Sequence, residues 1–212
     1  MVVFKKLIML IGVILFQKSI THAQMVEFYR GNNRSGIDIM WFKKVLNAEK
    51  KPTSFLFFSR NRASTQNGMA GTAFGSTNAI SYNFKNGVGI VAVAAYTNNA
   101  LTYKAGMQYA YQQADFTFFG WLVTDLNANG NIDCFGLLRY TPKINKRFKG
   151  LFQYEMFPVL QPANGFWNIT LRVRAGAKWQ QWAVGFMADF NHQGKNQWQV
   201  TTNAGLFLRY DF

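Results

Sequence analysis

The chain of 212 residues has few cysteines, histidines and acidic residues. Cys134 is its only cysteine, which excludes an internal disulfide even in an oxidising compartment. Because only two histidines accompany that cysteine, we expect no transition-metal site built from imidazole or thiolate ligands. The sequence also lacks a P-loop, a dinucleotide-binding fingerprint, a zinc-ligand spacing and a paired-carboxylate hydrolase motif. These absences predict a protein that is not an enzyme and that needs no cofactor.

Long hydrophobic runs are also missing beyond the N-terminus. The strongest apolar run there covers residues 88–95, whereas a membrane-spanning helix needs roughly 20 apolar residues. The N-terminus itself differs, because Lys5 and Lys6 precede a short apolar core at 7–16, and small residues follow at 21 and 23. This pattern predicts a signal peptide over residues 1–23, cleaved after Ala23, and a single exported domain over 24–212.

The charge balance is strongly basic. Lysine and arginine total 23 against nine acidic residues, giving a net charge of +14. Loss of the three lysines in residues 1–23 lowers this to +11. In a cytosolic protein such a charge would indicate nucleic acid. In an exported protein it indicates anionic lipid headgroups or a lumen that attracts anions, so we expect no nucleic-acid partner.

Period-two alternation recurs in segments of about ten residues separated by turn residues, which is the signature of a transmembrane barrel. In residues 167–179, Ile169, Leu171 and Val173 alternate with polar residues that include Arg172 and Arg174. Soluble sandwiches alternate too, but their strands average five or six residues. Here the strands are longer, and aromatic residues gather at their ends, as in interfacial girdles. The pattern therefore favours a membrane barrel.

The number of strands follows from the same alternation. Eleven segments alternate clearly, and single-chain bacterial barrels have even numbers of strands. A short first strand at Met25–Arg30 gives twelve, which we predict, with ten as the fallback. The eleven segments are 36–46, 53–63, 72–84, 87–97, 100–112, 114–125, 132–141, 147–160, 166–178, 180–191 and 197–212.

The last seven residues carry a family resemblance. Leu206, Leu208, Tyr210 and the terminal Phe212 share one face of a strand, and the chain stops at that aromatic residue. This ending resembles the C-terminal assembly signal of bacterial outer-membrane β-barrel proteins. The resemblance implies a transmembrane antiparallel up-and-down β-barrel in the outer membrane of a Gram-negative bacterium. It also implies that the barrel-assembly machinery and outer-membrane lipids are partners.

Basic residues on the polar register are the main candidate site. They are Arg172, Arg174, Lys178, Arg209, Arg139 and Lys104, and Asp133, Glu155, Asp189 and Asp211 share their register. One hypothesis is a small passive pore that prefers anions, lined by these cations. The other is a non-conducting structural or accessory barrel, closed by ion pairs, that binds lipopolysaccharide or a protein partner. Arg60 and Arg62, near a predicted outward strand end, would then contact lipopolysaccharide phosphates.

Two weaker motifs remain. Asp125, Asn127, Asn129 and Asp133 match the start of an EF-hand-type calcium loop, but the twelfth position is not acidic and the flanks are strands. The segment is therefore either a weak calcium loop or an ordinary turn.

His192 is the one histidine outside the predicted signal peptide. Its segment slightly resembles the His-x-Ser-Asn segment of outer-membrane phospholipases and lipid A deacylases. The position of their serine is Gly194, which supplies no nucleophile. Lipid hydrolysis is thus the third functional hypothesis, after the pore and the closed barrel.

Overall fold

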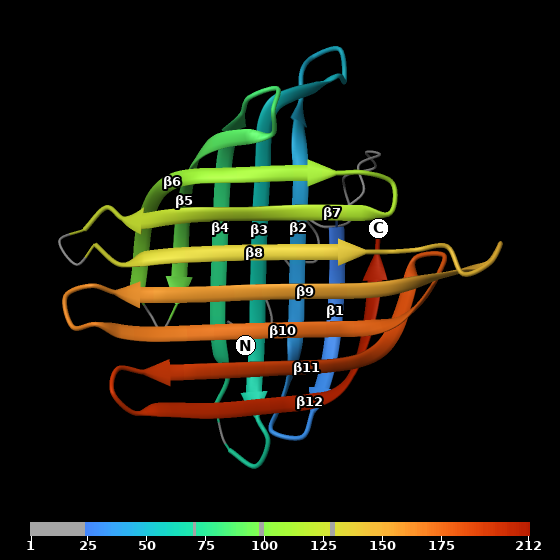
Figure 1. The fold of residues 1–212 in the computed structure, drawn as a ribbon. Helices are drawn as coiled ribbons and strands as arrows, with labels where there is room; N and C mark the ends of the chain where they lie inside the picture. The colour runs from blue at the N-terminus through green and yellow to red at the C-terminus, as the bar shows by residue number, and fades with distance from the viewer. Residues whose placement is uncertain (1–23, 70, 98–99, 128–129) are drawn as a thin grey trace, which may run out of the picture.

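The computed structural model of the protein describes residues 24–69, 71–97, 100–127 and 130–212, so the predicted signal peptide lies outside the described residues. Twelve antiparallel strands form one closed up-and-down barrel, in which each strand pairs with its neighbours in sequence and β1 pairs with β12 (Figure 1). The strands are β1 (Gln24–Gly31), β2 (Arg34–Leu46), β3 (Pro52–Gln66), β4 (Ala73–Asn83), β5 (Val88–Thr97), β6 (Ala100–Gln112), β7 (Phe116–Asp125), β8 (Ile132–Tyr140), β9 (Phe148–Gln161), β10 (Phe166–Trp179), β11 (Trp182–Gly194) and β12 (Trp198–Asp211).

The predicted transmembrane barrel of twelve strands is confirmed, and the fallback of ten is wrong. The doubtful first strand is β1, which pairs with both β2 and β12 and closes the barrel. The largest boundary differences are at β3 and β11, which each run three residues beyond the predicted end. In the part of the chain that the structure describes, no helix is long and apolar enough to cross a membrane.

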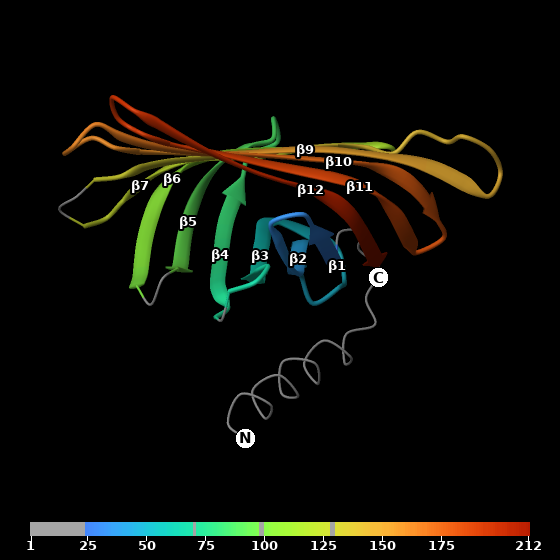
Figure 2. The same cartoon turned by 90° about the horizontal axis from the view of Figure 1, so that it is seen from below.

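The barrel is flattened rather than round. Strands β1–β4 form one wall and β7–β11 the facing wall, and the strands of the two walls cross one another (Figures 1 and 2). Aromatic rings join the walls: the ring centroids of Phe42 on β2 and Phe119 on β7 are 4.6 Å apart, and those of Phe58 on β3 and Phe119 are 5.4 Å apart. The space between the walls is therefore filled by side chains over part of its area.

The outer surface is apolar, as the alternation predicts. Large hydrophobic side chains such as Phe186, Leu206 and Ile90 are more than half exposed, and they alternate with inward residues along their strands. In water such a surface would be unstable, whereas in a bilayer it faces hydrocarbon. We call the end of the barrel that holds Gln24 and Phe212 the terminal end, and the opposite end, with the β1–β2 turn, the loop end.

The interior is divided into an apolar half and a polar half. The apolar half lies mainly along β2–β8 and consists of Met25, Met40, Phe42, Leu56, Phe58, Ala79, Val91, Val93, Phe119, Trp121, Val123, Phe135 and Leu137. The polar half lies along β1–β3 and β9–β12 and holds most of the buried charges. This division positions the candidate site on one side of the interior.

Candidate functional site: an ion network inside the barrel

Carboxylates gather inside the barrel. Of the nine acidic residues in the sequence, only Glu49 and Asp115 lie in turns, and the other seven point inward from strands. They alternate with apolar outward residues, as Asp38 does with Ile37 and Ile39. Because buried carboxylates require paired cations or hydrogen-bond donors, the inward arginines and lysines meet them there.

Arg60 on β3 links two walls of the barrel. Its Nε donates to Oδ1 of Asp38 on the neighbouring β2 at 3.0 Å, and its Nη1 donates to Oε2 of Glu155 on β9 at 2.9 Å. Strands β3 and β9 lie on opposite sides of the twelve-stranded barrel. Asp38 also accepts from Arg62 Nη2 at 2.5 Å. The Arg60–Glu155 contact therefore crosses the interior and narrows it.

Glu27 on β1 joins two further arginines. Arg174 on β10 donates from Nε to Glu27 Oε1 at 2.9 Å and from Nη1 to Asp189 Oδ1 at 2.7 Å. Arg209 on β12 donates from Nε to Glu27 Oε2 at 3.0 Å and is fully buried. At the loop end, Arg34 Nη2 reaches Asp189 at 3.3 Å. These contacts tie together β1, β2, β10, β11 and β12.

Gln153 on β9 connects the two groups of ion pairs. Its Oε1 accepts from Arg209 Nη1 at 2.9 Å, and its Nε2 donates to Glu155 Oε1 at 2.5 Å. The same Oε1 accepts from Arg139 Nε at 2.7 Å. Within the described residues, Arg139 has no carboxylate partner, so its charge is uncompensated by direct pairing. We call the connected set the interior ion network; it consists of Glu27, Arg34, Asp38, Arg60, Arg62, Arg139, Gln153, Glu155, Arg172, Arg174, Asp189 and Arg209.

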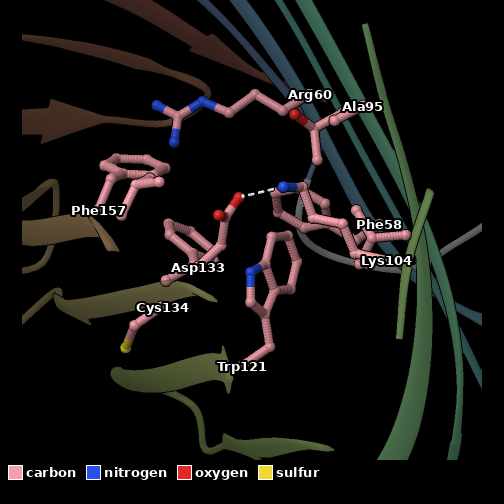
Figure 3. Close-up of a pocket in the computed structure, with 12 residues that line it drawn as sticks. Phe58, Arg60, Ala95, Lys104, Trp121, Asp133, Cys134 and Phe157 are labelled. Carbon is pink, nitrogen blue, oxygen red and sulfur yellow. Dashed lines mark ion pairs between the residues drawn. The ribbon is translucent and has the colours of Figure 1, made fainter. Parts of the chain in front are cut away.

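A small cavity lies where this network meets the apolar half. It has a volume of about 90 Å³, and Phe58, Trp121 and Phe157 line it together with Arg60 (Figure 3). The Phe157 ring contacts two guanidinium groups: its centroid is 5.3 Å from Cζ of Arg60 and 4.9 Å from Cζ of Arg172. Cation–π contact of this kind compensates part of the arginine charge without a carboxylate.

A second ion cluster lies across the cavity from Phe157. Lys104 on β6 contacts Asp125, and its Nζ is 2.9 Å from Oδ2 of Asp133 on β8 (Figure 3). The side chain of Cys134 points away from the cavity in the same view, because it occupies the outward register of β8. The cavity thus has aromatic walls with charged pairs at two sides.

Several inward polar atoms have no hydrogen-bond partner in the described part of the protein. They include the hydroxyl of Tyr29, Oδ1 of Asp133 and Asp211, and the Nε atoms of Arg34, Arg62 and Arg172. Buried polar groups are nearly always satisfied by protein or ordered water. These atoms therefore mark places where the interior is suited to hold water or a polar solute.

The structure places all six predicted lumen cations inside the barrel. Arg172, Arg174, Arg209 and Arg139 belong to the interior ion network, Lys104 contacts Asp125 and Asp133, and Lys178 pairs with Asp211. Their predicted position on the polar register is therefore correct, whereas a role in attracting anions stays a prediction.

The structure places Arg60 and Arg62 inside the barrel, away from the outer position that the predicted contact with lipopolysaccharide requires. Both side chains point inward and share Asp38, and Arg60 is buried. The segment from Ser59 to Ala63 is polar on both faces, so alternation alone did not show which residues face out. The structure assigns the arginines to the interior because their carboxylate partners are there.

The predicted calcium loop joins β7 and β8. Asp125 contacts the ammonium of Lys104 and accepts from Asn131 Nδ2 at 2.9 Å, while Asn129 lies outside the described residues. Asp133 points inward and is shared with the same ammonium. A calcium ion would have to displace Lys104 from both carboxylates, and calcium binding stays a prediction.

His192 lies in β11, beyond the predicted strand end at residue 191, because the strand continues to Gly194. Its cross-strand neighbours are Ile169 and Val200, both apolar. In the described residues, no group of three or more histidine, cysteine, aspartate or glutamate side chains is arranged to hold a metal ion. The surroundings of His192 thus offer neither a nucleophile nor an orienting carboxylate in register.

The sequence analysis assigned no role to the acidic residues on β1 and β2. Glu27 and Asp38 become central to the interior ion network, and their signal was the period-two pattern around each of them. The apolar half of the interior had no such signal. In β7, Phe119 and Trp121 point inward while Phe118 and Leu122 point outward, so both faces of the strand are apolar.

Comparison with known proteins shows the fold and no specific family. No family model and no curated protein matches the sequence. Among solved structures, a KdgM porin in complex with disordered oligogalacturonate is similar, with 13% identity, a TM-score of 0.52, and coverage of 89% of this chain and 98% of that one. A NanC porin has 11% identity and a TM-score of 0.49 over 90% and 99% of the two chains. The chain therefore shares the fold of outer-membrane porins.

Proposed function

We propose that this protein is a passive channel for small solutes in the outer membrane of a Gram-negative bacterium. The interior ion network is the observation that carries this proposal, because it forms a connected polar path from Arg34 near the loop end to Arg139 towards the terminal end. Along that path, the Nε atoms of Arg62 and Arg172 have no hydrogen-bond partner in the described residues, which favours water inside. The porin-like fold is consistent with this function.

The path is expected to be narrow and to prefer anions. The Arg60–Glu155 contact crosses the interior, so we expect low conductance. Cations outnumber carboxylates inside, and Arg139 has no carboxylate partner in the described residues. A lining with excess positive charge attracts anions and repels cations. Nothing in the surroundings of His192 supports hydrolysis, so we propose that the protein is not an enzyme.

The channel is tested by single-channel recording. The full chain is expressed in bacteria, purified from the outer membrane in detergent, and inserted into a planar bilayer under a salt gradient. We expect a small, steady conductance with a reversal potential on the anion side. The charge-balanced double variant Arg60→Ala/Glu155→Ala removes the contact that crosses the interior, so its conductance should rise while its reversal potential keeps the same sign.

The control is the double variant Lys51→Ala/Glu49→Ala, which removes an exposed ion pair with an N–O distance of 2.8 Å in the β2–β3 turn. It should leave both quantities unchanged. If the native protein and the Arg60→Ala/Glu155→Ala variant insert as folded barrels and stay silent, the channel proposal is wrong.

A second function is favoured by the aromatic contacts between the walls. Phe42, Phe58 and Phe119 fill the interior of the apolar half, and the cavity beside it measures only about 90 Å³. A barrel closed in this way would act as a structural or accessory protein that binds lipopolysaccharide or another membrane protein. Silent bilayers for both the native protein and the double variant would support this function over the channel.

A further inference from the structure

A polar patch interrupts the apolar outer surface on β3 and β4. Ser59 and Asn61 alternate with the inward Arg60 and so occupy the outward register, and Asn78 and Ser76 lie opposite them. Asn78 is exposed, Asn61 and Ser76 are half-buried, and Ser59 is buried. The four residues form a hydrogen-bonded row, which we call the outer polar patch. On the far wall, the outward residues in the middle of β10 and β11 are apolar; they are Val173, Ala175, Val184 and Phe186.

The hydrogen bonds within the patch run in one direction. Asn78 Nδ2 donates to Ser76 Oγ at 3.1 Å, Ser76 Oγ donates to Asn61 Oδ1 at 2.8 Å, and Asn61 Nδ2 donates to Ser59 Oγ at 3.2 Å. Asn78 is exposed, and its Oδ1 accepts no hydrogen bond from the described residues. The row therefore ends in an amide that has an unused acceptor on the outer surface.

The patch lies at the depth of the hydrocarbon. Towards the terminal end, the outward rings of Phe55 and Tyr82 are 5.3 Å apart, and towards the loop end those of Phe74 and Tyr96 are 6.3 Å apart. Aromatic rows of this kind mark the two membrane interfaces of a barrel. The outer polar patch lies between them, where lipid tails offer no hydrogen-bond partner.

The neighbours of the patch are small. Ala63 on β3 follows Asn61 in the outward register, and Ala92 and Ala94 on β5 lie opposite Ile80 and Asn78. Small residues beside polar ones allow two transmembrane surfaces to approach closely enough for hydrogen bonds between them.

We propose that the outer polar patch is the contact between two copies of this chain. The patch carries no charge and contains both donors and acceptors, so it is complementary to itself: a primary amide both donates to and accepts from an identical amide turned by a two-fold rotation. A two-fold axis beside Asn78 brings the same residues of both copies together, as in an isologous dimer. The unused acceptor of Asn78 in one copy then accepts from the amide of the other.

Cross-linking at residue 94, which lies opposite Asn78 on β5, tests the proposal and leaves the outer polar patch intact. The full chain carrying Cys134→Ala and Ala94→Cys is purified from the outer membrane, reconstituted into phosphatidylcholine vesicles and treated with a mild oxidant. A two-fold axis at this position brings the two new thiols within disulfide reach, so we expect a covalent dimer. The matched control is Cys134→Ala with Ala175→Cys, a small outward residue on the far wall, which should stay monomeric.

A second variant tests whether the polar contact itself holds the dimer. Asn61→Leu/Asn78→Leu replaces both amides by apolar side chains on a surface that already faces lipid, so the barrel should fold. The loss of each hydrogen bond should raise the dissociation constant of the dimer, measured by sedimentation equilibrium in detergent, by about tenfold.

Three results would overturn the proposal. They are the absence of a covalent dimer with the residue 94 cysteine, equal cross-linking of the residue 175 control, and an unchanged dissociation constant in the double leucine variant. Cross-linking at residue 94 to a different protein in intact membranes, with no dimer of the purified chain, would also overturn it. None of these readouts depends on conductance, so the dimer proposal can be wrong while the channel proposal is correct.

Discussion

Arg209 is the largest fully buried side chain in the described residues, and its guanidinium donates hydrogen bonds to Glu27 and Gln153. Removing one member of a buried ion pair leaves an uncompensated charge, which typically destabilises a protein by about 3–5 kcal/mol. We therefore expect Arg209→Met to lower the free energy of unfolding by that amount. Urea unfolding of the barrel in lipid vesicles, followed by tryptophan fluorescence, measures it.

The exposed pair Lys51–Glu49 provides the control at the same scale. Both side chains are about two-thirds exposed or more, at 74% and 68%, so Lys51→Ala should change stability by about 0–1 kcal/mol. An Arg209→Met barrel as stable as the Lys51→Ala barrel would mean that water or a counter-ion compensates Glu27. In that case the interior would be wetter than the burial of Arg209 implies.

At the scale of elements, the seam between β1 and β12 depends on glycine. Gly205 on β12 lies opposite Gly31 on β1. Along its length, β12 curves from the wall of β9–β11 towards the wall that holds β1 (Figure 2). A Cβ at Gly205 would be 2.0 Å from the carbonyl oxygen of Arg30 and 2.6 Å from Gly31 Cα, so backbone would have to move. Glycine commonly occupies such bends in barrels because another backbone passes close to it.

We expect Gly205→Ala to destabilise closure of the barrel by about 1–3 kcal/mol, the usual range for overpacking. The fraction of protein that keeps the fast-migrating folded form in unheated gel electrophoresis should fall at intermediate urea. Gly75→Ala is the matched control, since a Cβ there would meet Thr97 Cγ2 at 3.5 Å and the carbonyl oxygen of Tyr96 at 4.0 Å, both ordinary contact distances. Equal losses for the two variants would show that the seam has no special need for glycine.

Alternation predicted the elements well because it depends on one physical contrast, lipid outside against polar groups inside. Where that contrast holds, as in β10 with Arg172 and Arg174 inward, both the strand and its faces were correct. Where it fails, the faces could not be assigned. In β3 the outward Ser59 and Asn61 are as polar as the inward Arg60, and the sequence offered no reason to place the arginines inside.

At the scale of the whole molecule, contacts between distant strands decide what sequence patterns leave open. Arg60 meets Glu155 from 95 residues away, and Arg209 meets Glu27 from 182 residues away. Such pairs depend on how the closed barrel flattens. The two-residue alternation along a single strand does not specify that flattening. The same flattening brings Phe119 against Phe42 and Phe58, and it divides the interior into a half that holds the walls together and a half that is polar.

This division predicts that stability and ion preference respond to different variants. Phe119→Ala removes a buried ring that contacts four other aromatic residues, so the free energy of unfolding should fall by about 3–5 kcal/mol. Because the proposed path follows the polar half, the reversal potential under a salt gradient should stay unchanged. Arg172→Gln should do the reverse. The Arg172 side chain is partly exposed and its Nε has no hydrogen-bond partner in the described residues, so its loss should shift the reversal potential towards cations. Planar-bilayer recordings and urea unfolding of both variants measure the two effects. A shift of reversal potential in Phe119→Ala with none in Arg172→Gln would place the conducting path in the apolar half instead.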